Sequence, residues 1–251
     1  MSDYTFMLGT WQLRWMDLVD HPLFISINYL KNRKQKRFDN QIAPVCIDSG
    51  GFTELSRFGK WTSTPQEYVA SLHHVMDLGL DITWASQQDW MVEDMILDKT
   101  GLSIEDHQQR TVKNLRDLRS LTDRVHFIPV LQGQSLEDYF THFEMFEVAG
   151  FDLRSEPIVG VGSVCRREST KEIDHIIKCL ASKGLNLHGF GMKISGVANN
   201  RDHLISSDSM AWSIRARLEN ARCKDHADSP GAKDCRNCLT YALEWREKVI
   251  A

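Results

Sequence analysis

The sequence lacks the long apolar run that a membrane-spanning helix requires. No stretch of the 251 residues reaches the roughly 20 apolar positions that cross a bilayer. The first residues, Met-Ser-Asp-Tyr, lack the basic-then-apolar order of a secretion signal, and internal repeats and low-complexity tracts are also missing. We therefore expect one large domain that has no membrane partner and works in the cytoplasm.

Neither charge nor cysteine is in large excess. The net charge of −4 argues against a protein that coats nucleic acid nonspecifically. Of the six cysteines, Cys46, Cys165 and Cys179 lie in or beside apolar segments, as buried free thiols do. One local basic cluster could face a phosphate backbone or simply be a solvated loop. Its members are Lys31, Arg33, Lys34, Lys36 and Arg37.

Short apolar or β-branched runs recur along the chain, and from residue 43 onward helical patterns separate them. This alternation is typical of βα units built around a parallel sheet, and eight strands suffice to close a barrel. The sequence therefore predicts an α/β fold, a (β/α)8 TIM barrel. The candidate strands are residues 5–11, 23–28, 45–49, 82–86, 126–131, 158–163, 187–192 and 204–206.

The helices between these strands carry clear start signals. In each, a Ser or Thr is followed three residues later by an acidic residue, which is the capping-box pattern. Glycines that follow several of the apolar stripes provide stops. The predicted caps are Thr64, Ser103, Ser135 and Ser169.

The tail of the chain has the spacing of a metal site. Cys223, His226, Cys235 and Cys238 form a C-x2-H-x8-C-x2-C pattern within sixteen residues. Thiolate and imidazole are the ligands of a tetrahedral structural zinc, and a disulfide is the weaker alternative in a reducing compartment. We predict one structural Zn2+ with all four positions filled. A zinc-binding segment, residues 221–251, would then pack on a barrel formed by residues 1–220.

Polar or glycine residues follow five successive predicted strands. Because a barrel keeps its chemistry at the carboxyl ends of its strands, these residues are expected to line one pocket. Carboxylate, amide and backbone groups there would bind the polar edge of a purine, and glycines would leave room for its face. The alternative for each stretch is an ordinary turn. The stretches are Asp48–Phe52, Gln87–Trp90, Gln132–Gln134, Val159–Ser163 and His188–Met192.

Asp208 is the candidate nucleophile. It lies where a short apolar strand gives way to a helical run, Met210–Leu218, so the barrel would place it at the same mouth. The alternative is that Asp208 caps the following helix, because Asp and Ser are preferred N-cap residues. The polar ends of the other strands favour a catalytic role for Asp208.

In their order along the chain, these motifs resemble those of tRNA-guanine transglycosylases, which are zinc-bearing (β/α)8 barrels that exchange guanine for a 7-deazaguanine. The likeness covers nearly the whole chain and includes an Asp 17 residues after Gly191. The sequence is most similar to a shorter branch, the deazapurine DNA modification protein A (DpdA) family. The stretches that carry this likeness are Asp48–Leu55, Gln87–Met91, Gly162–Arg167 and Asp208–Ser213.

The resemblance implies a role for each matching residue. Asp208 would attack C1′ of the target nucleotide and hold a covalent glycosyl intermediate. Asp48 would manage the proton as one base leaves and the other enters. Phe52 matches the ring that stacks on the base, and Asp89 and Gln132 match the side chains that bind its edge. The other implied substrate-binding residues are Ser49, Gly50, Gly51, Gly133, Gly160, Val161, His188, Gly189 and Gly191.

The chain departs from the transglycosylase pattern at three places. Arg166 and Arg167 stand where an acidic residue is usual, and with the basic cluster above they are the predicted nucleic-acid contacts. His188 stands where the tRNA enzymes carry a sulfur-containing stacking residue. The metal-ligand spacing also differs from the C-x-C-x2-C pattern of those enzymes.

We therefore expect a transglycosylase that replaces guanine in DNA with a 7-deazaguanine, with 7-cyano-7-deazaguanine (preQ0) as the favoured base. It would act in a bacterial or virus-infected cell, with partner proteins of a DNA-modification system. Two alternatives stay open: an enzyme directed at tRNA, and a noncatalytic zinc-containing barrel that binds nucleic acid. Loss of function in an Asp208→Asn variant would separate the enzymes from the binding barrel.

Overall fold

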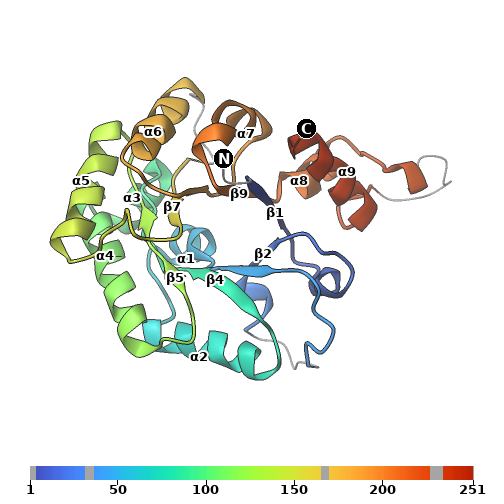
Figure 1. Ribbon diagram of the computed structural model, residues 1–251, viewed down its shortest axis with the longest axis horizontal. Coiled ribbons are helices and arrows are strands. Elements are labelled where there is room, and N and C mark those ends of the chain that lie inside the picture. The colour runs from blue at the N-terminus through green and yellow to red at the C-terminus, as the bar shows by residue number, and fades with distance from the viewer. Residues whose placement is uncertain (1–3, 32–36, 165–169, 227–233, 251) are drawn as a thin grey trace.

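A single parallel sheet organises the molecule (Figure 1). The computed structural model describes residues 4–31, 37–164, 170–226 and 234–250. Nine short strands pair in the order β5-β4-β3-β2-β1-β9-β8-β7-β6, and every pairing is parallel. Their bounds are β1 Thr5–Gly9, β2 Leu23–Ser26, β3 Val45–Asp48, β4 Ile82–Ser86, β5 Phe127–Ile128, β6 Val130–Leu131, β7 Val159–Val161, β8 Leu187–Gly189 and β9 Ser206–Ser209.

The nine strands correspond to the eight that were predicted, because Pro129 divides the fifth. Proline has no N–H to donate to a ladder, so β5 and β6 on either side of it count as separate strands. β5 pairs with β4 and β6 pairs with β7, while the Pro129 carbonyl accepts from the Gly160 amide at 2.8 Å. One stretch of chain thus joins the two edges of the sheet. The TIM-barrel prediction is confirmed.

Helices surround the strands (Figure 1), and three of them begin as predicted. Thr64, Ser103 and Ser135 each form a complete capping box, at α2, α4 and α5. The predicted cap Ser169 lies outside the described residues. The helices are α1 Gly51–Phe58, α2 Pro65–Asp77, α3 Asp94–Thr100, α4 Ile104–Leu121, α5 Leu136–Val148, α6 Thr170–Ser182, α7 Ile194–Asn200, α8 Ala211–Leu218 and α9 Leu239–Ile250, with short 3-10 turns at Leu13–Asp17, Ile27–Tyr29, Arg201–His203 and Lys224–His226.

The first two strands are followed by 3-10 turns instead of α-helices, so another part of the chain covers them. Helix α9 packs against β1, with the rings of Trp245 and Phe6 5.8 Å apart. Ala242, Trp245 and Val249 belong to the same hydrophobic cluster as the strand residues. The C-terminal helix therefore replaces the helix that β1 lacks.

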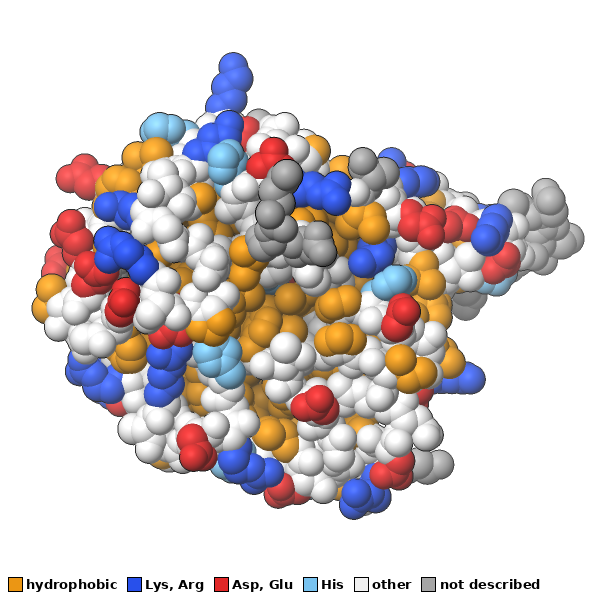
Figure 2. Space-filling model, viewed as in Figure 1, with side chains coloured by type: hydrophobic (Ala, Val, Ile, Leu, Met, Phe, Trp, Pro, Cys, Tyr) orange, Lys and Arg blue, Asp and Glu red, His pale blue; other side chains and the backbone are white. Residues whose placement is uncertain are grey.

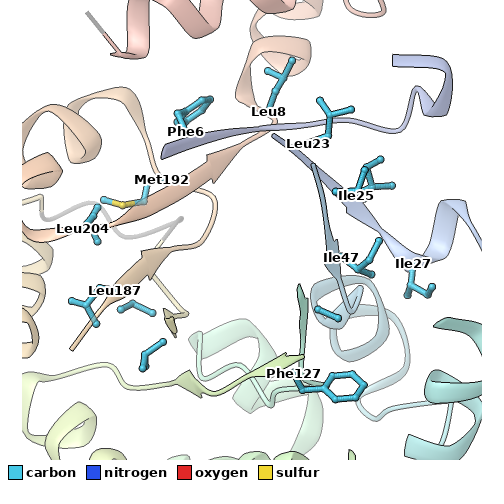
Figure 3. Packing of buried hydrophobic residues seen from close by; sticks show 14 of the residues in the cluster. Phe6, Leu8, Leu23, Ile25, Ile27, Ile47, Phe127, Leu187, Met192 and Leu204 are labelled. Atoms are coloured by element: carbon cyan, nitrogen blue, oxygen red, sulfur yellow. The ribbon is translucent and has the colours of Figure 1, made fainter. Parts of the chain in front are cut away.

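Alternate residues of the strands divide the core into two layers. Phe6, Leu8, Leu23 and Ile25 point away from the ring of strands toward the helices (Figure 3). The residues between them form a second, smaller cluster inside the barrel. Its buried members are Met7, Phe24, Cys46, Trp84, Ile128 and Ile158.

The register of the strands carries two carboxylates onto the inner face. Met7 of β1 is paired with Asp208 of β9. Phe24 of β2 is paired with Cys46 of β3, and the Ser26–Asp48 pair follows two positions later on the same two strands. Because side chains alternate along a strand, Asp208 and Asp48 share the inner face with Met7 and Cys46. The last strand was predicted at residues 204–206, which is two to three residues too early. β9 is Ser206–Ser209, so Asp208 lies inside the strand and all four of its residues are buried.

In the described part of the chain, every helix is too short or too polar to span a lipid bilayer. In the view of Figure 2, hydrophobic side chains show at the centre, over the ring of strands, and charged side chains of both signs are interspersed around the edge.

Candidate active site and metal centre

A cavity of about 410 Å³ opens at the carboxyl ends of the strands. Its wall combines carboxylates with aromatic rings, which suits a flat polar ligand. Of the sequence-predicted site residues, seven line it: Asp48, Gly51, Phe52, Asp89, Gln132, Gly191 and Asp208. These seven residues come from five of the eight strand ends and meet at one place.

Asp208 is held in the cavity wall by the backbone of the neighbouring strand end. Its Oδ1 accepts a hydrogen bond from the Gly191 amide at 2.9 Å, and its own carbonyl accepts from the Met192 amide at 3.0 Å. The side chain is 6% exposed, so one edge of the carboxylate still faces the cavity. Helix α8 is preceded by Met210, whose side chain makes no capping bond. The helix-capping alternative for Asp208 is therefore wrong.

Asp48 is a half-buried carboxyl group that lines the same cavity as that nucleophile candidate. Burial raises the pKa of Asp48, hydrogen bonds from the Gly50 amide and the Ser26 hydroxyl oppose the rise, and the charge of Asp208 adds to it. Gly50 has φ +81°, and a Cβ there would lie 2.2 Å from Nδ2 of Asn28. Only glycine fits this turn, which brings the backbone N–H to the Asp48 carboxylate.

Asp89 forms the second acidic wall of the cavity and is linked to Gln132. Gln132 Nε2 donates to Asp89 Oδ2 at 2.5 Å, and the Ser163 hydroxyl lies 2.6 Å from Gln132 Oε1. Burial, with added repulsion from Asp48 and Glu93, raises the pKa of Asp89 to about 7. Asp89 can therefore change its protonation state near neutral pH, as groups that handle protons or bind ligands often do.

His188 lies behind Asp208 and away from the cavity. It is fully buried, with its ring edge-on to Trp84 at 5.0 Å and to Phe190 at 4.7 Å between centroids. Its Nδ1 lies 2.9 Å from Ser206 Oγ, and its Nε2 lies 3.4 Å from Asp208 Oδ1. The second distance is longer than a formed hydrogen bond, and Nε2 has no other partner among the described residues. The ring is thus aimed at the candidate nucleophile.

The remaining predicted substrate-binding residues lie outside the cavity wall. A Cβ on Gly160 would meet the Phe190 ring at 2.4 Å, and one on Gly189 would meet Met192 Sδ at 2.2 Å. These glycines allow two wall elements to pack closely. Gly133 packs in the same way against Tyr139, and the Ser49 amide donates to Ser86 Oγ. Val161 is buried in β7, and Gly50 forms the turn before α1.

Several wall residues were missed by the sequence reasoning. Ser26 comes two positions after the inward Phe24, and Ser86 comes two positions after the inward Trp84. Period-2 alternation alone could have placed both at the mouth. Gly162, Ser163 and Phe190 also line the cavity and lie in the predicted stretches Val159–Ser163 and His188–Met192. The missed residues are Gly9, Thr10, Phe24, Ser26, Asn28, Tyr29, Thr53, Ser86, Met91 and Met210.

The four predicted metal ligands converge in the tail. One ligand atom from each of Cys223, His226, Cys235 and Cys238 lies within 4.8 Å of the others. Cys223 Sγ is 3.6 Å from Cys238 Sγ and 3.7 Å from Cys235 Sγ, and His226 Nδ1 is 3.1 Å from Cys223 Sγ. A tetrahedron with Zn–S bonds of about 2.3 Å has S···S edges of about 3.8 Å. The donor set and its spacing therefore fit zinc.

Hydrogen bonds hold the two ligand turns in place. The Cys223 amide donates to Cys235 Sγ at 3.3 Å, an arrangement that favours a thiolate. The Cys235 amide donates to the Ala221 carbonyl, and the Ser213 hydroxyl of α8 donates to the Arg236 carbonyl. The cluster is thereby tied to the helix that directly follows β9, the strand of Asp208.

Two members of the predicted basic cluster can be placed. Lys31 Nζ lies 3.8 Å from the buried Glu54 carboxylate, and Arg37 Nε donates to Asp39 Oδ1 at 3.0 Å. Each cation therefore has an acidic neighbour from its own chain. The other predicted nucleic-acid contacts, Arg33, Lys34, Lys36, Arg166 and Arg167, lie outside the described residues.

Together these features define an α/β barrel with an acidic, aromatic-lined cavity at its mouth and a Cys3His cluster that suits zinc. The model of one protein family, DpdA, described as DeoxyPurine in DNA protein A, matches residues 1–251. The chain belongs to this family. No curated protein matches it. A solved structure from Sinorhizobium meliloti, described as a proposed isomerase in an open-loop conformation, shares 10% identity at a TM-score of 0.43. The match covers 82% of this chain and 50% of that one, so the chain spans about half its length.

Proposed function

We propose that the protein exchanges guanine in DNA for a 7-deazaguanine, specifically 7-cyano-7-deazaguanine, through a covalent intermediate on Asp208. Family membership supports chemistry on purines in DNA. The single observation that carries the mechanism is that Asp208, Asp48 and Asp89 line one cavity of about 410 Å³ together with Phe52. A nucleophile, a proton carrier and an acceptor for a base edge are then available around one flat ligand.

In the first half of the reaction, an Asp208 carboxylate oxygen attacks C1′ of the target nucleotide. The bond between C1′ and N9 of guanine breaks, and the leaving base takes up a proton that Asp48 delivers. Because burial raises the pKa of Asp48, its protonated form is more populated than that of an exposed aspartate. In the second half, the incoming base gives its N9 proton back to Asp48, and its N9 attacks C1′ and releases Asp208. Proton and carboxylate are both restored.

Phe52, Asp89 and Gln132 would recognise the base. Guanine and its 7-deaza analogues share N–H donors on one edge, and an ionised Asp89 could accept from two of them. The hydrogen bond that Asp89 now accepts from Gln132 would be shared with, or replaced by, the ligand. A base without those donors would leave the buried carboxylate unpaired, which costs about 1–3 kcal/mol or more.

His188 would act through Asp208, not on the base. If the Ser206 hydroxyl donates to Nδ1, the ring carries its proton on Nε2 and directs it to Asp208 Oδ1, 3.4 Å away. This contact would fix the carboxylate rotamer before attack. The ring is 0% exposed and surrounded by Trp84, Phe24 and Phe190, so stacking on a base in the cavity is not its role.

The Cys3His cluster would hold a structural zinc ion, with residues 221–251 as a segment packed on the barrel of residues 1–220. All four protein ligands converge, which leaves no coordination position for substrate. The ion would supply folding stability to the segment that supports α8 and, through it, the strand of Asp208.

Nucleoside mass spectrometry tests the proposal. DNA and tRNA are digested from cells that supply 7-cyano-7-deazaguanine and express either the intact chain or Asp208→Asn. A deazaguanine deoxynucleoside found only with the intact chain is the expected result. The same base found only in tRNA would transfer the enzyme to the tRNA-directed alternative. Modification of neither pool, even when proteins encoded beside this chain are supplied as partners, would leave the noncatalytic binding barrel as the better interpretation.

A further inference from the structure

A second hollow lies beside the cavity, on the outer side of the barrel between the α1–α2 connection and helix α4. It has a volume of about 290 Å³. Its residues come from three segments: Trp61, Ser63 and Pro65 from the connection, Gln88 and Trp90 from the end of β4, and Arg110, Lys113, Asn114 and Asp117 from α4. Gln88 and Trp90 belong to the predicted stretch Gln87–Trp90, whereas the other seven residues were not among the predicted site residues.

The floor of this hollow is cross-linked by hydrogen bonds among the three segments. The Gln88 amide donates to Asn114 Oδ1 at 2.9 Å, and Gln88 Nε2 donates to the Ser63 carbonyl at 3.0 Å. The Trp90 amide donates to Thr111 Oγ1 at 2.8 Å. The two indoles are therefore held on a fixed frame, which lowers the entropy cost of binding a ligand.

The hollow and the cavity share a wall. Gly51 and Asp89 line the cavity, and Trp90 directly follows Asp89 along the chain. A Cβ on Gly51 would lie 3.2 Å from the Trp61 ring, so only a glycine backbone separates that ring from the cavity. A strand that leaves the cavity over this wall would therefore pass Trp61 and Trp90.

The chemistry of the hollow suits a nucleotide. Trp61 and Trp90 are both half-buried, so part of each ring faces solvent. The Arg110 guanidinium lies over the Trp90 ring at 4.5 Å from its centroid, and Arg110 is exposed. Lys113 is ion-paired with Asp117 on the same helix, so Arg110 is the principal positive group. Indole faces and a guanidinium are the groups that hold single-stranded nucleic acid.

A neighbouring depression extends the same track. Ser63 lines both the hollow and a pocket of about 230 Å³ that also contains Ser49 and Lys31. A basic side chain therefore stands on each side of the Trp61 loop, Lys31 on one side and Arg110 on the other. Because Lys31 is paired with Glu54, Arg110 remains the principal candidate for a phosphate contact.

We propose that this hollow binds the DNA nucleotide next to the target guanine, with its base on Trp61 and Trp90 and its phosphate on Arg110. The proposal rests on the proposed function for the identity of the strand. The hollow would hold the strand while the target base is out of the stack, which the cavity alone cannot do. Because stacking accepts any base, the hollow adds affinity without sequence preference.

Binding of a fluorescent single-stranded DNA oligonucleotide that contains one guanine tests the site. Arg110→Ala should weaken binding about fivefold and make the dependence of log affinity on log salt shallower by about 0.7, the value for one lost phosphate contact on a single strand. Trp90→Ala should weaken binding about tenfold, and Trp90→Phe should restore most of it because it keeps a stacking face. Arg116→Ala is the matched control: Arg116 is exposed on the same helix and donates to the Ala149 carbonyl outside the hollow.

Steady-state exchange separates this proposal from the proposed function. Arg110→Ala should raise the KM for the oligonucleotide by the same factor, while kcat and the KM for 7-cyano-7-deazaguanine stay as in the intact chain. If the intact chain exchanges bases and Arg110→Ala equals Arg116→Ala in affinity and salt dependence, the hollow is not a strand site and the proposed function stands. If the intact chain exchanges no base yet Arg110→Ala still weakens DNA binding, the hollow stands and the proposed function fails. Preference for an RNA oligonucleotide of the same sequence would overturn the DNA assignment.

Discussion

The cavity at the barrel mouth and the Cys3His cluster are assembled in opposite ways. The cluster takes its four ligands from residues 223–238 and brings their atoms within 4.8 Å. The cavity takes its carboxylates from β3, β9 and the end of β4, which lie far apart in the sequence. In the cluster four ligand atoms converge on one point, whereas in the cavity burial, with the charges of neighbouring carboxylates, raises the pKa of Asp48 and of Asp89. Stability and chemistry are therefore concentrated in different regions, and mutations should separate them.

The largest separation between activity and stability is expected for a substitution at Asp208. Asp208→Asn removes the attacking oxygen but keeps the shape of the side chain, so base exchange by the purified protein should fall at least about 10³-fold. The melting temperature and the zinc content should stay as in the intact chain. Asp202→Asn, at an exposed position in the 3-10 turn before β9, should leave exchange unchanged. Retained turnover in Asp208→Asn would refute the nucleophile assignment.

A substitution in the Cys3His cluster should instead lower the stability and the metal content of the protein. Cys235→Ser removes one of four metal ligands, so the zinc content should fall, and about 3 kcal/mol of lost stability would lower the melting temperature by roughly 6–12 °C. Metal analysis and thermal unfolding measure both effects on one sample. Cys179→Ser, on α6 and outside the cluster, should keep the metal. An unchanged metal stoichiometry in Cys235→Ser would mean that the ligand set is wrong.

A smaller effect is expected at His188, whose ring faces Asp208 without lining the cavity. His188→Leu should lower kcat about 10- to 100-fold, the value of one hydrogen bond to a charged group, with little change in the KM for the incoming base. His188→Gln should recover part of the loss because its amide can again donate to Asp208. A large rise in the KM for the base with unchanged kcat would instead show that His188 contacts the base.

The smallest effect is a dependence of stability on pH at Asp89. In the folded protein the pKa of Asp89 is raised from 3.8 to about 7, so between these values the folded state holds a proton that the unfolded state has released. The free energy of unfolding therefore falls as pH rises from 3.8 to about 7, and the loss is complete above it. Asp89→Asn should be more stable than the intact chain by about 1–3 kcal/mol at pH 8, and nearly equal at pH 4. Urea unfolding at the two pH values measures the difference.

Local patterns in the sequence predicted local structure well. The capping boxes at Thr64, Ser103 and Ser135 and the four metal ligands each depend on residues that are near neighbours in the chain. The strand ends at Asp48 and Gln132 could also be predicted, because apolar runs and polar interruptions are visible in the sequence. Both kinds of feature depend on the spacing of residue types along the chain.

Features that depend on distant neighbours could not be predicted. β9 is a strand of four polar residues, and it is buried only because β1 and β8 flank it at the polar end of the barrel. Gly160 and Gly189 were expected to face the base, but they make room for Phe190 and Met192, which approach from the following chain. His188 was expected among the base contacts, and only the fold shows that its ring turns toward Asp208.

The packing of α9 on β1 has a consequence for how the protein folds during its synthesis. β1 is synthesised well before its partner strand β9 and its covering helix α9. Phe6 and the outer face of β1 therefore stay uncovered on the ribosome until residues 206–250 have emerged. The barrel cannot close progressively as the chain grows, so a nascent chain must keep its first strand from aggregating until the tail arrives. Ribosome-bound chains that stop before α9 should be captured by chaperones that bind exposed apolar segments.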